Sequence, residues 1–148
     1  MKAACYLMLL VSLVSTGGCC EEVHFTPQRP TSVRGWHEFN EQGAHVIGEF
    51  VLNKGEDVDN GRLGVELVKI IPRKRCHDLS AENDTIPRAL MKFYRAKDHQ
   101  PIGEIEVTKG ASSRLVNYNI PVDGYGVDAV FVREINTKDE WIWFELLK

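Results

Sequence analysis

The chain has 148 residues and a formal net charge of −3, and 43% of its residues are hydrophobic while 26% are charged. A chain of this length accommodates one ordinary domain, and its composition is that of a globular protein, which excludes wholesale disorder. The near-neutral charge balance argues against a nucleic-acid binder driven by bulk electrostatics.

The first eighteen residues have the layout of a secretory signal. One lysine precedes an apolar run over residues 3–14, and small residues follow it at positions 15–18. A charged start, an apolar middle and small residues before the cleavage point are typical of such signals. The run is also shorter than the roughly 18 residues that a membrane-spanning helix needs. We therefore expect residues 1–18 to be a signal peptide and the protein to be exported.

Two cysteines follow this segment directly. The stretch Thr16-Gly17-Gly18-Cys19 resembles the signal region of bacterial lipoproteins, and the resemblance covers residues 1–20 only. It implies that the sulfur of Cys19 is acylated, that Cys19 becomes the mature N-terminus, and that the lipid anchors the protein in the bacterial cell envelope. Ordinary cleavage after Gly17 or Gly18 is the alternative, and it would give a soluble secreted protein.

The remaining cysteines bear on the same question. If Cys19 carries lipid, then Cys20 and Cys76 are left as an even pair in an oxidising compartment. These two residues could form a disulfide, provided that their Cα separation allows it. The alternative is that Cys76 is a free thiol.

The mature chain divides into a tether and a domain. Residues 19–43 form an N-terminal tether, because Pro27 and Pro30 each remove a backbone donor and fix φ. Residues 44–148 alternate apolar runs with turn signals, and several runs show the period-two pattern of half-buried strands. We predict strands at 44–53, 62–71, 89–96, 102–109, 114–121, 127–135 and 140–147. The connection 72–88 could hold one helical turn near residues 79–83.

Short strands with a turn signal about every ten residues predict an all-β domain. We expect a single antiparallel β-sandwich of about seven strands, immunoglobulin-like or C2-like, and a small barrel is the alternative. The sequence Asp123-Gly124-Tyr125 before the sixth strand resembles the tyrosine corner of immunoglobulin-like folds.

Acidic residues in the turns suggest a cation site. In a simple meander, alternate loops lie at the same end, which would gather Asp57, Asp59, Asp98 and Asp123. A calcium ion requires several oxygen ligands at once, although the spacing is not that of an EF-hand. The alternative is a solvated turn whose acids only keep it soluble.

Two further features have a functional and a structural interpretation. Trp141 and Trp143 lie on one face of the last strand, where they could stack on a sugar ring or pack in the core. The stretch 69–97 has eight Lys and Arg residues against three acidic residues. It could meet an anionic partner, or its charges could simply keep an edge strand soluble.

No motif for catalysis is present. The chain has no paired zinc ligands at short spacing, no nucleophile elbow and no glycine-rich phosphate loop. Residues 21–148 resemble no family that we recognise. We predict a non-enzymatic envelope protein with a binding or structural role and no cofactor. It would contact the membrane through its lipid and bind an envelope protein or polysaccharide, but no nucleic acid. The alternative is a carbohydrate- or calcium-binding module that uses the turn loops or the two tryptophans.

Overall fold

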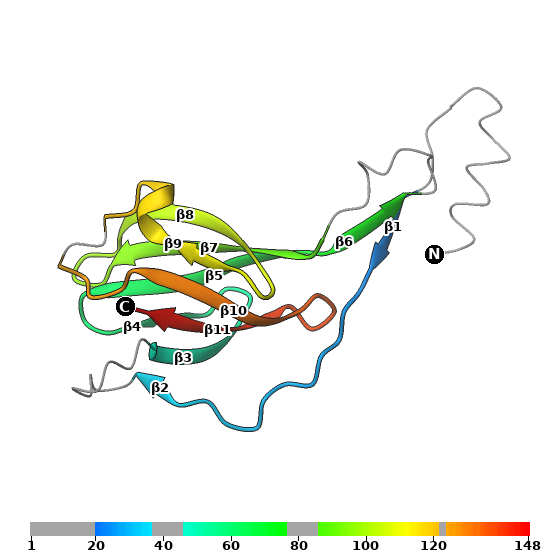
Figure 1. Cartoon of the computed structure of the whole chain (residues 1–148), viewed down its shortest axis with the longest axis horizontal. Coiled ribbons are helices and arrows are strands. Elements are labelled where there is room, and N and C mark those ends of the chain that lie inside the picture. Colours follow the sequence, from blue (N-terminus) through cyan, green and yellow to red (C-terminus); the bar gives the residue numbers. More distant parts are fainter. Residues whose placement is uncertain (1–19, 37–45, 77–85, 122–123) are drawn as a thin grey trace, which may run out of the picture.

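The computed structural model describes residues 20–36, 46–76, 86–121 and 124–148 (Figure 1). Every strand pairing in these segments is antiparallel, and they contain no α-helix. The one helical element in them is the short 3-10 helix η2 (Leu115–Tyr118). The predicted all-β class is therefore confirmed. The predicted signal peptide and Cys19 lie outside the described residues.

The strands form two large sheets and one small one. The five-stranded sheet has the order β2 (Gly35–Trp36), β3 (Val46–Asn53), β11 (Trp141–Leu147), β10 (Ala129–Asn136) and β9 (Ser112–Arg114). The four-stranded sheet has the order β4 (Asp57–Asp59), β5 (Leu63–Ile71), β7 (Arg88–Arg95) and β8 (Gln100–Thr108). The small sheet pairs β1 (Cys20–Val23) with β6 (Arg73–Cys76).

The two large sheets share one hydrophobic core. Phe50 and Phe144 reach it from the five-stranded sheet, and Leu67, Met91 and Phe93 reach it from the four-stranded sheet. Successive side chains of a strand point to opposite faces, so the alternation in the sequence selects which residues are buried. Burying each of these large side chains contributes about 1.5–3 kcal/mol to folding. The residues that alternate with these core residues therefore point away from the core.

The strand order is that of a meander. In both large sheets, neighbouring strands follow one another along the chain, with two exceptions: β11 also pairs with β3, and β6 of the small sheet falls between β5 and β7. A Greek key would instead return a strand through a long connection to lie beside the first. The immunoglobulin-like or C2-like topology is therefore not confirmed. Each sheet also keeps two edge strands and does not close into a barrel.

Six of the seven predicted strands correspond to observed ones, namely β3, β5, β7, β8, β10 and β11. The strand predicted at 114–121 is wrong, because β9 ends at Arg114 and the chain turns into η2. Leu115 and Ile120 are buried there from a tight turn that ends with Asn119 in the left-handed region. The sequence also failed to predict β4, which lies in the acidic stretch assigned to a turn. The helical turn predicted near 79–83 lies outside the described residues.

The small sheet is a ribbon that extends away from the two large sheets (Figure 1). Its strands carry opposite charges, with Glu21 opposite Arg75 and Glu22 opposite Lys74. Opposite charges in directly facing positions stabilise a strand pair. Because β6 follows β5 directly in the chain, the ribbon extends outward from the end of β5. Cys20, the first residue described, lies at its tip.

Candidate functional site

An N-terminal segment crosses the outer face of the five-stranded sheet, the face that points away from the core. We call residues 24–36 the strap. The backbone N–H of Phe25 donates to Oγ1 of Thr137 at 2.8 Å, and Nη1 of Arg29 donates to Oδ1 of Asn53 at 2.7 Å. The strap then ends in β2, which pairs with β3. Its two ends are thus fixed to the sheet, with residues 30–34 between them.

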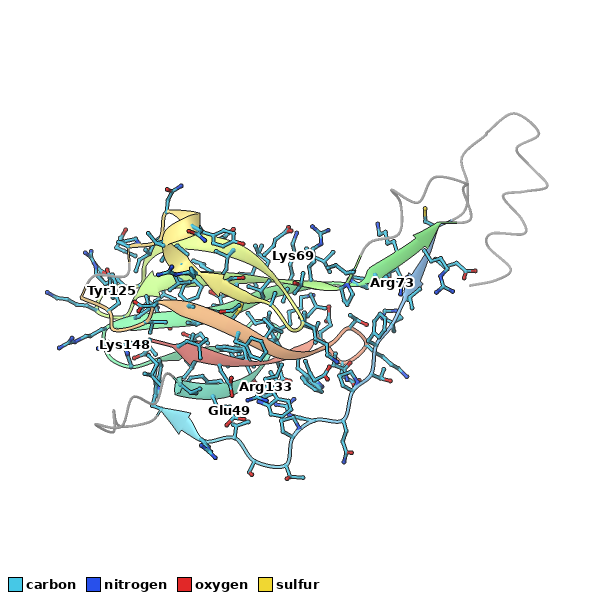
Figure 2. The ribbon with its side chains drawn as sticks, in the orientation of Figure 1. Glu49, Lys69, Arg73, Tyr125, Arg133 and Lys148 are labelled. Atoms are coloured by element: carbon cyan, nitrogen blue, oxygen red, sulfur yellow. The ribbon has the colours of Figure 1, made fainter. Side chains whose placement is uncertain are left out.

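A cavity of about 490 Å³ lies between the strap and the sheet. Its size falls within the roughly 300–1,000 Å³ of small-molecule sites. Figure 2 shows Glu49 and Arg133 on the side of the sheet that faces the strap. The lining consists of Ser32, Val33 and Arg34 from the strap, and Val46, Glu49, Arg133, Trp143 and Glu145 from the sheet. We call this space the outer-face cavity.

Strand alternation places the lining residues of β11. Ile142, Phe144 and Leu146 are fully buried in the core. Trp143 and Glu145 must therefore point to the opposite face. The register sets Glu145 directly opposite Glu49 of β3.

Arg133 lies at an irregularity in β10, and it points to the outer face because its neighbour Val132 is buried in the core. The register shifts between Val132 and Glu134, so Arg133 has no partner across the ladder to β11. A bulge of this kind bends the strand and changes the direction of a side chain, and bulges are common next to functional sites. The guanidinium carbon of Arg133 lies 5.8 Å from the ring centroids of both Phe131 and Trp143. A cation at the bulge thus lies over two aromatic rings.

Two hydrogen bonds offset the repulsion between the facing carboxylates. Like charges in directly opposed positions destabilise a strand pair. Nη2 of Arg133 donates to Oε1 of Glu145 at 2.5 Å, and Nε1 of Trp143 donates to Oε1 of Glu49 at 3.0 Å. The hydrogen bond that Arg133 donates to Glu145 raises the pKa of Arg133, burial opposes that rise, and the charges of Glu145 and Glu49 add to it. Glu145 is only 7% exposed, so its partner Arg133 is what keeps this carboxylate compensated.

The strap adds a second cation. Arg34 lines the cavity and makes no hydrogen bond or ion pair with any described residue. The lining therefore has two guanidinium groups and two carboxylates, with a formal charge of zero. Neither histidine nor cysteine is found among these lining residues. The cavity is thus polar, neutral overall and rich in fixed donors and acceptors.

The two predicted tryptophans differ in accessibility. Trp141 is 3% exposed, and the guanidinium of Arg29 lies 5.9 Å from its ring centroid. Trp143 is partly exposed in the outer-face cavity. Both lie on the outer face and neither belongs to the core cluster. The strap therefore leaves Trp143 available to a ligand and covers Trp141.

The predicted calcium ligands of the first loop are used locally. The hydroxyl of Tyr94 donates a hydrogen bond to Asp57, and Asp59 accepts one from a backbone N–H of its own turn. Tyr94 is almost fully buried and its ring stacks on His99. Burial, followed by the hydrogen bond and charge of Asp57, raises the pKa of Tyr94. Asp57 therefore has a structural partner.

The other predicted calcium ligands do not join them. Asp98 accepts hydrogen bonds from Nε and Nη2 of Arg95 at 2.8 and 2.5 Å, and these hold the pKa of Asp98 at about 2. Asp123 lies outside the described residues. Within the described segments, no three His, Cys, Asp or Glu residues gather closely enough to hold a metal ion. The structure thus does not bring Asp57, Asp59 and Asp98 together as a cation site.

Cys20 lies at the tip of the ribbon. Cys20 is disulfide-bonded, and the register sets its backbone directly opposite Cys76. Opposed residues of antiparallel strands have Cα atoms about 4.5–5.5 Å apart, which is within the range of a disulfide. The register therefore satisfies the distance requirement of the predicted Cys20–Cys76 bridge.

Part of the basic stretch is paired with acidic residues across the strands. Nη1 of Arg88 lies 2.6 Å from Oε2 of Glu106, and Nζ of Lys92 lies 4.0 Å from Oε2 of Glu66. Such pairs favour the interpretation that these charges keep the sheet surface soluble.

A second cavity of about 590 Å³ lies at the end of the sheets near the ribbon. Phe25, Pro27, Ile86 and Pro87 give it mainly apolar walls. Its two charged residues pair with each other, with Nζ of Lys109 2.6 Å from Oε1 of Glu134. It therefore has fewer polar groups to orient a ligand than the outer-face cavity has.

Sequence reasoning missed most of the outer-face cavity. Glu49, Arg133 and Arg34 carry no local signal, because long-range strand pairing and the strap bring them together. Glu145 did carry one, since it is a charged residue inside the apolar run 141–147. A charge in such a run indicates a paired, functional or interface position.

The described residues contain no helix with the length and apolarity that crossing a bilayer would require. No family model, no curated protein and no solved structure matches the chain. The function must therefore be inferred from the geometry of the outer-face cavity and from the N-terminal ribbon.

Proposed function

We propose that the protein is an exported, lipid-anchored β-sandwich of the bacterial cell envelope with a non-enzymatic binding role. The outer-face cavity is its binding site. The two facing sheets with their common core support the sandwich architecture.

One observation carries the proposal, namely the disulfide at Cys20. Disulfides form and persist in oxidising compartments outside the cytoplasm. Cys20 directly follows Cys19, the residue expected to carry the lipid. An exported protein accounts for both the disulfide and the apolar segment at residues 3–14.

The ribbon supports an anchored arrangement. Cys20 lies at the ribbon tip, away from the two large sheets (Figure 1). A strand of four residues spans about 13 Å. An anchor at Cys19 would therefore hold the sheets at a distance from the membrane and leave the cavity open to the surroundings.

The cavity supports binding. Arg133 with Glu145, and Trp143 with Glu49, form two mutually oriented pairs in one polar space. Such fixed donors and acceptors cost little to organise when a ligand arrives. Their arrangement suits recognition of a polar small molecule or of one unit of a polymer.

Intact mass spectrometry of the protein from bacterial membranes, with and without reductant, tests the proposal. We expect a chain that begins at Cys19 and carries the mass of acyl chains. Cys19→Ser should lose the acyl mass, whereas the matched control Cys20→Ser should keep it. An unacylated chain with a different N-terminus would contradict the anchor.

A further inference from the structure

We infer that the outer-face cavity binds a neutral saccharide, with one sugar ring against Trp143 and neighbouring hydroxyls on Glu49 and Arg133. This inference names the ligand class and rests on the proposed function only in taking this cavity as the binding site.

The charge of the cavity favours a neutral ligand. Its two guanidinium groups and two carboxylates cancel formally, and Arg133 and Glu145 already neutralise each other at 2.5 Å. A charged ligand group placed at Arg133 or Glu145 would compete with that pair, and removing the partner of the largely buried Glu145 carboxylate is costly. A neutral ligand can enter without breaking it.

The hydrogen-bonding capacity of the cavity favours hydroxyl groups. A carboxylate only accepts and a guanidinium only donates, whereas a hydroxyl does both. Adjacent hydroxyls on one ring can therefore donate to Glu49 and accept from Arg133 at the same time. Hydrogen bonds to ionised groups are also the stronger ones.

The shape of the cavity favours a ring with an apolar face. Trp143 supplies a flat surface, part of which faces the guanidinium of Arg133. Its Nε1–H, already donating to Glu49, fixes the orientation of the indole. A pyranose ring has a C–H face for such a surface and hydroxyls around its edge. The volume of about 490 Å³ is of the order that small-molecule sites show.

The strap supplies the outer wall. Ser32 and Arg34 add donors from the side opposite the sheet. Because Arg34 has no partner among the described residues, its guanidinium can donate to further hydroxyls without losing an existing contact.

The test is calorimetric titration of the purified full chain with methyl glucoside, methyl galactoside and oligomers of N-acetylglucosamine. Free glycine and arginine serve as zwitterionic and cationic probes. We expect at least one sugar to bind and the two amino acids not to bind. In a parallel NMR titration, the sugar should shift the indole N–H signal of Trp143, which is identified by its loss in Trp143→Phe, and leave that of Trp141 in place.

Two variants locate the binding. Glu49→Gln should weaken sugar binding about tenfold, which is the effect of losing one charge-assisted hydrogen bond. Glu106→Gln is the matched control, because Glu106 is also a strand carboxylate that accepts a side-chain hydrogen bond, from Arg88, on the outer face of the other sheet. It should leave the affinity unchanged, and circular dichroism checks that both variants are folded.

Three results would overturn the inference: no sugar bound at millimolar concentration, equal binding by wild type and Glu49→Gln with no shift of the Trp143 signal, or an amino acid bound at Trp143 in place of the sugars. These results are separable from the proposed function. An acylated chain that binds no sugar contradicts this inference alone, whereas an unacylated chain that binds sugar contradicts only the anchor.

Discussion

Replacing Gly64 with alanine should destabilise the fold, because the ring of Tyr94 occupies the space that a side chain would need. Gly64 on β5 lies directly opposite Tyr94 on β7. A Cβ at position 64 would lie 2.0 Å from Cζ of Tyr94 and 2.2 and 2.5 Å from its two Cε atoms. The ring has little freedom to move, because it is 3% exposed, its hydroxyl donates to Asp57, and His99 stacks on it at 4.8 Å.

The magnitude follows from two contributions. Overpacking a well-packed site costs about 1–3 kcal/mol. A displaced ring also weakens the hydrogen bond to Asp57, and such bonds to charged groups contribute about 1.5–3 kcal/mol. We expect Gly64→Ala to lower the free energy of unfolding by about 2–4 kcal/mol, which corresponds to a decrease in Tm of roughly 5–15 °C.

Urea denaturation in three backgrounds measures the effect. Gly64→Ala should cost most in the wild type, less in Tyr94→Phe, where the hydroxyl is already gone, and least in Tyr94→Ala, where the ring is gone. Contacting residues show this kind of non-additivity. An equal loss in the Tyr94→Ala background, or no loss in the wild type, would refute the reasoning.

Three other predictions concern the termini and turns. Peptide mapping without reductant should link Cys20 to Cys76, and a Cys76 recovered as a free thiol would contradict this. Cys76→Ser should lower the free energy of unfolding by up to about 4 kcal/mol, because the disulfide removes the entropy of closing a loop of about 57 residues. The bonds from Arg95 lower the pKa of Asp98 from 3.8 to about 2 in the folded state. Their contribution is therefore present above pH 3.8 and is lost as the pH falls through 2, so Asp98→Asn should be less stable than wild type at neutral pH and equal to it in stronger acid. Denaturant midpoints at both pH values check this, and a constant difference would count against it. Millimolar calcium should leave Tm unchanged, because Asp57 and Asp98 are engaged by other side chains; a calorimetric rise in Tm would contradict this.

The sequence by itself determined the all-β class and most of the strands. Alternation with a period of two is a local property, and it selects the buried face of a strand wherever the strand lies. Alternation alone therefore separates Ile142, Phe144 and Leu146 from Trp141 and Trp143. The same pattern predicted the wrong element at 114–121, because Leu115 and Ile120 are buried from a tight turn rather than from a strand.

Only the tertiary structure decided the strand order and the candidate site. Pairing between β3 and β11 joins segments from opposite ends of the domain, and no local pattern specifies such a contact. That pairing sets Glu49 opposite Glu145, and Arg133 of the neighbouring strand β10 then pairs with Glu145. The strap covers Trp141 and leaves Trp143 accessible, which residue spacing alone cannot distinguish. The physical reason is that a binding site depends on distances between residues far apart in the chain, whereas periodicity reports only on neighbours.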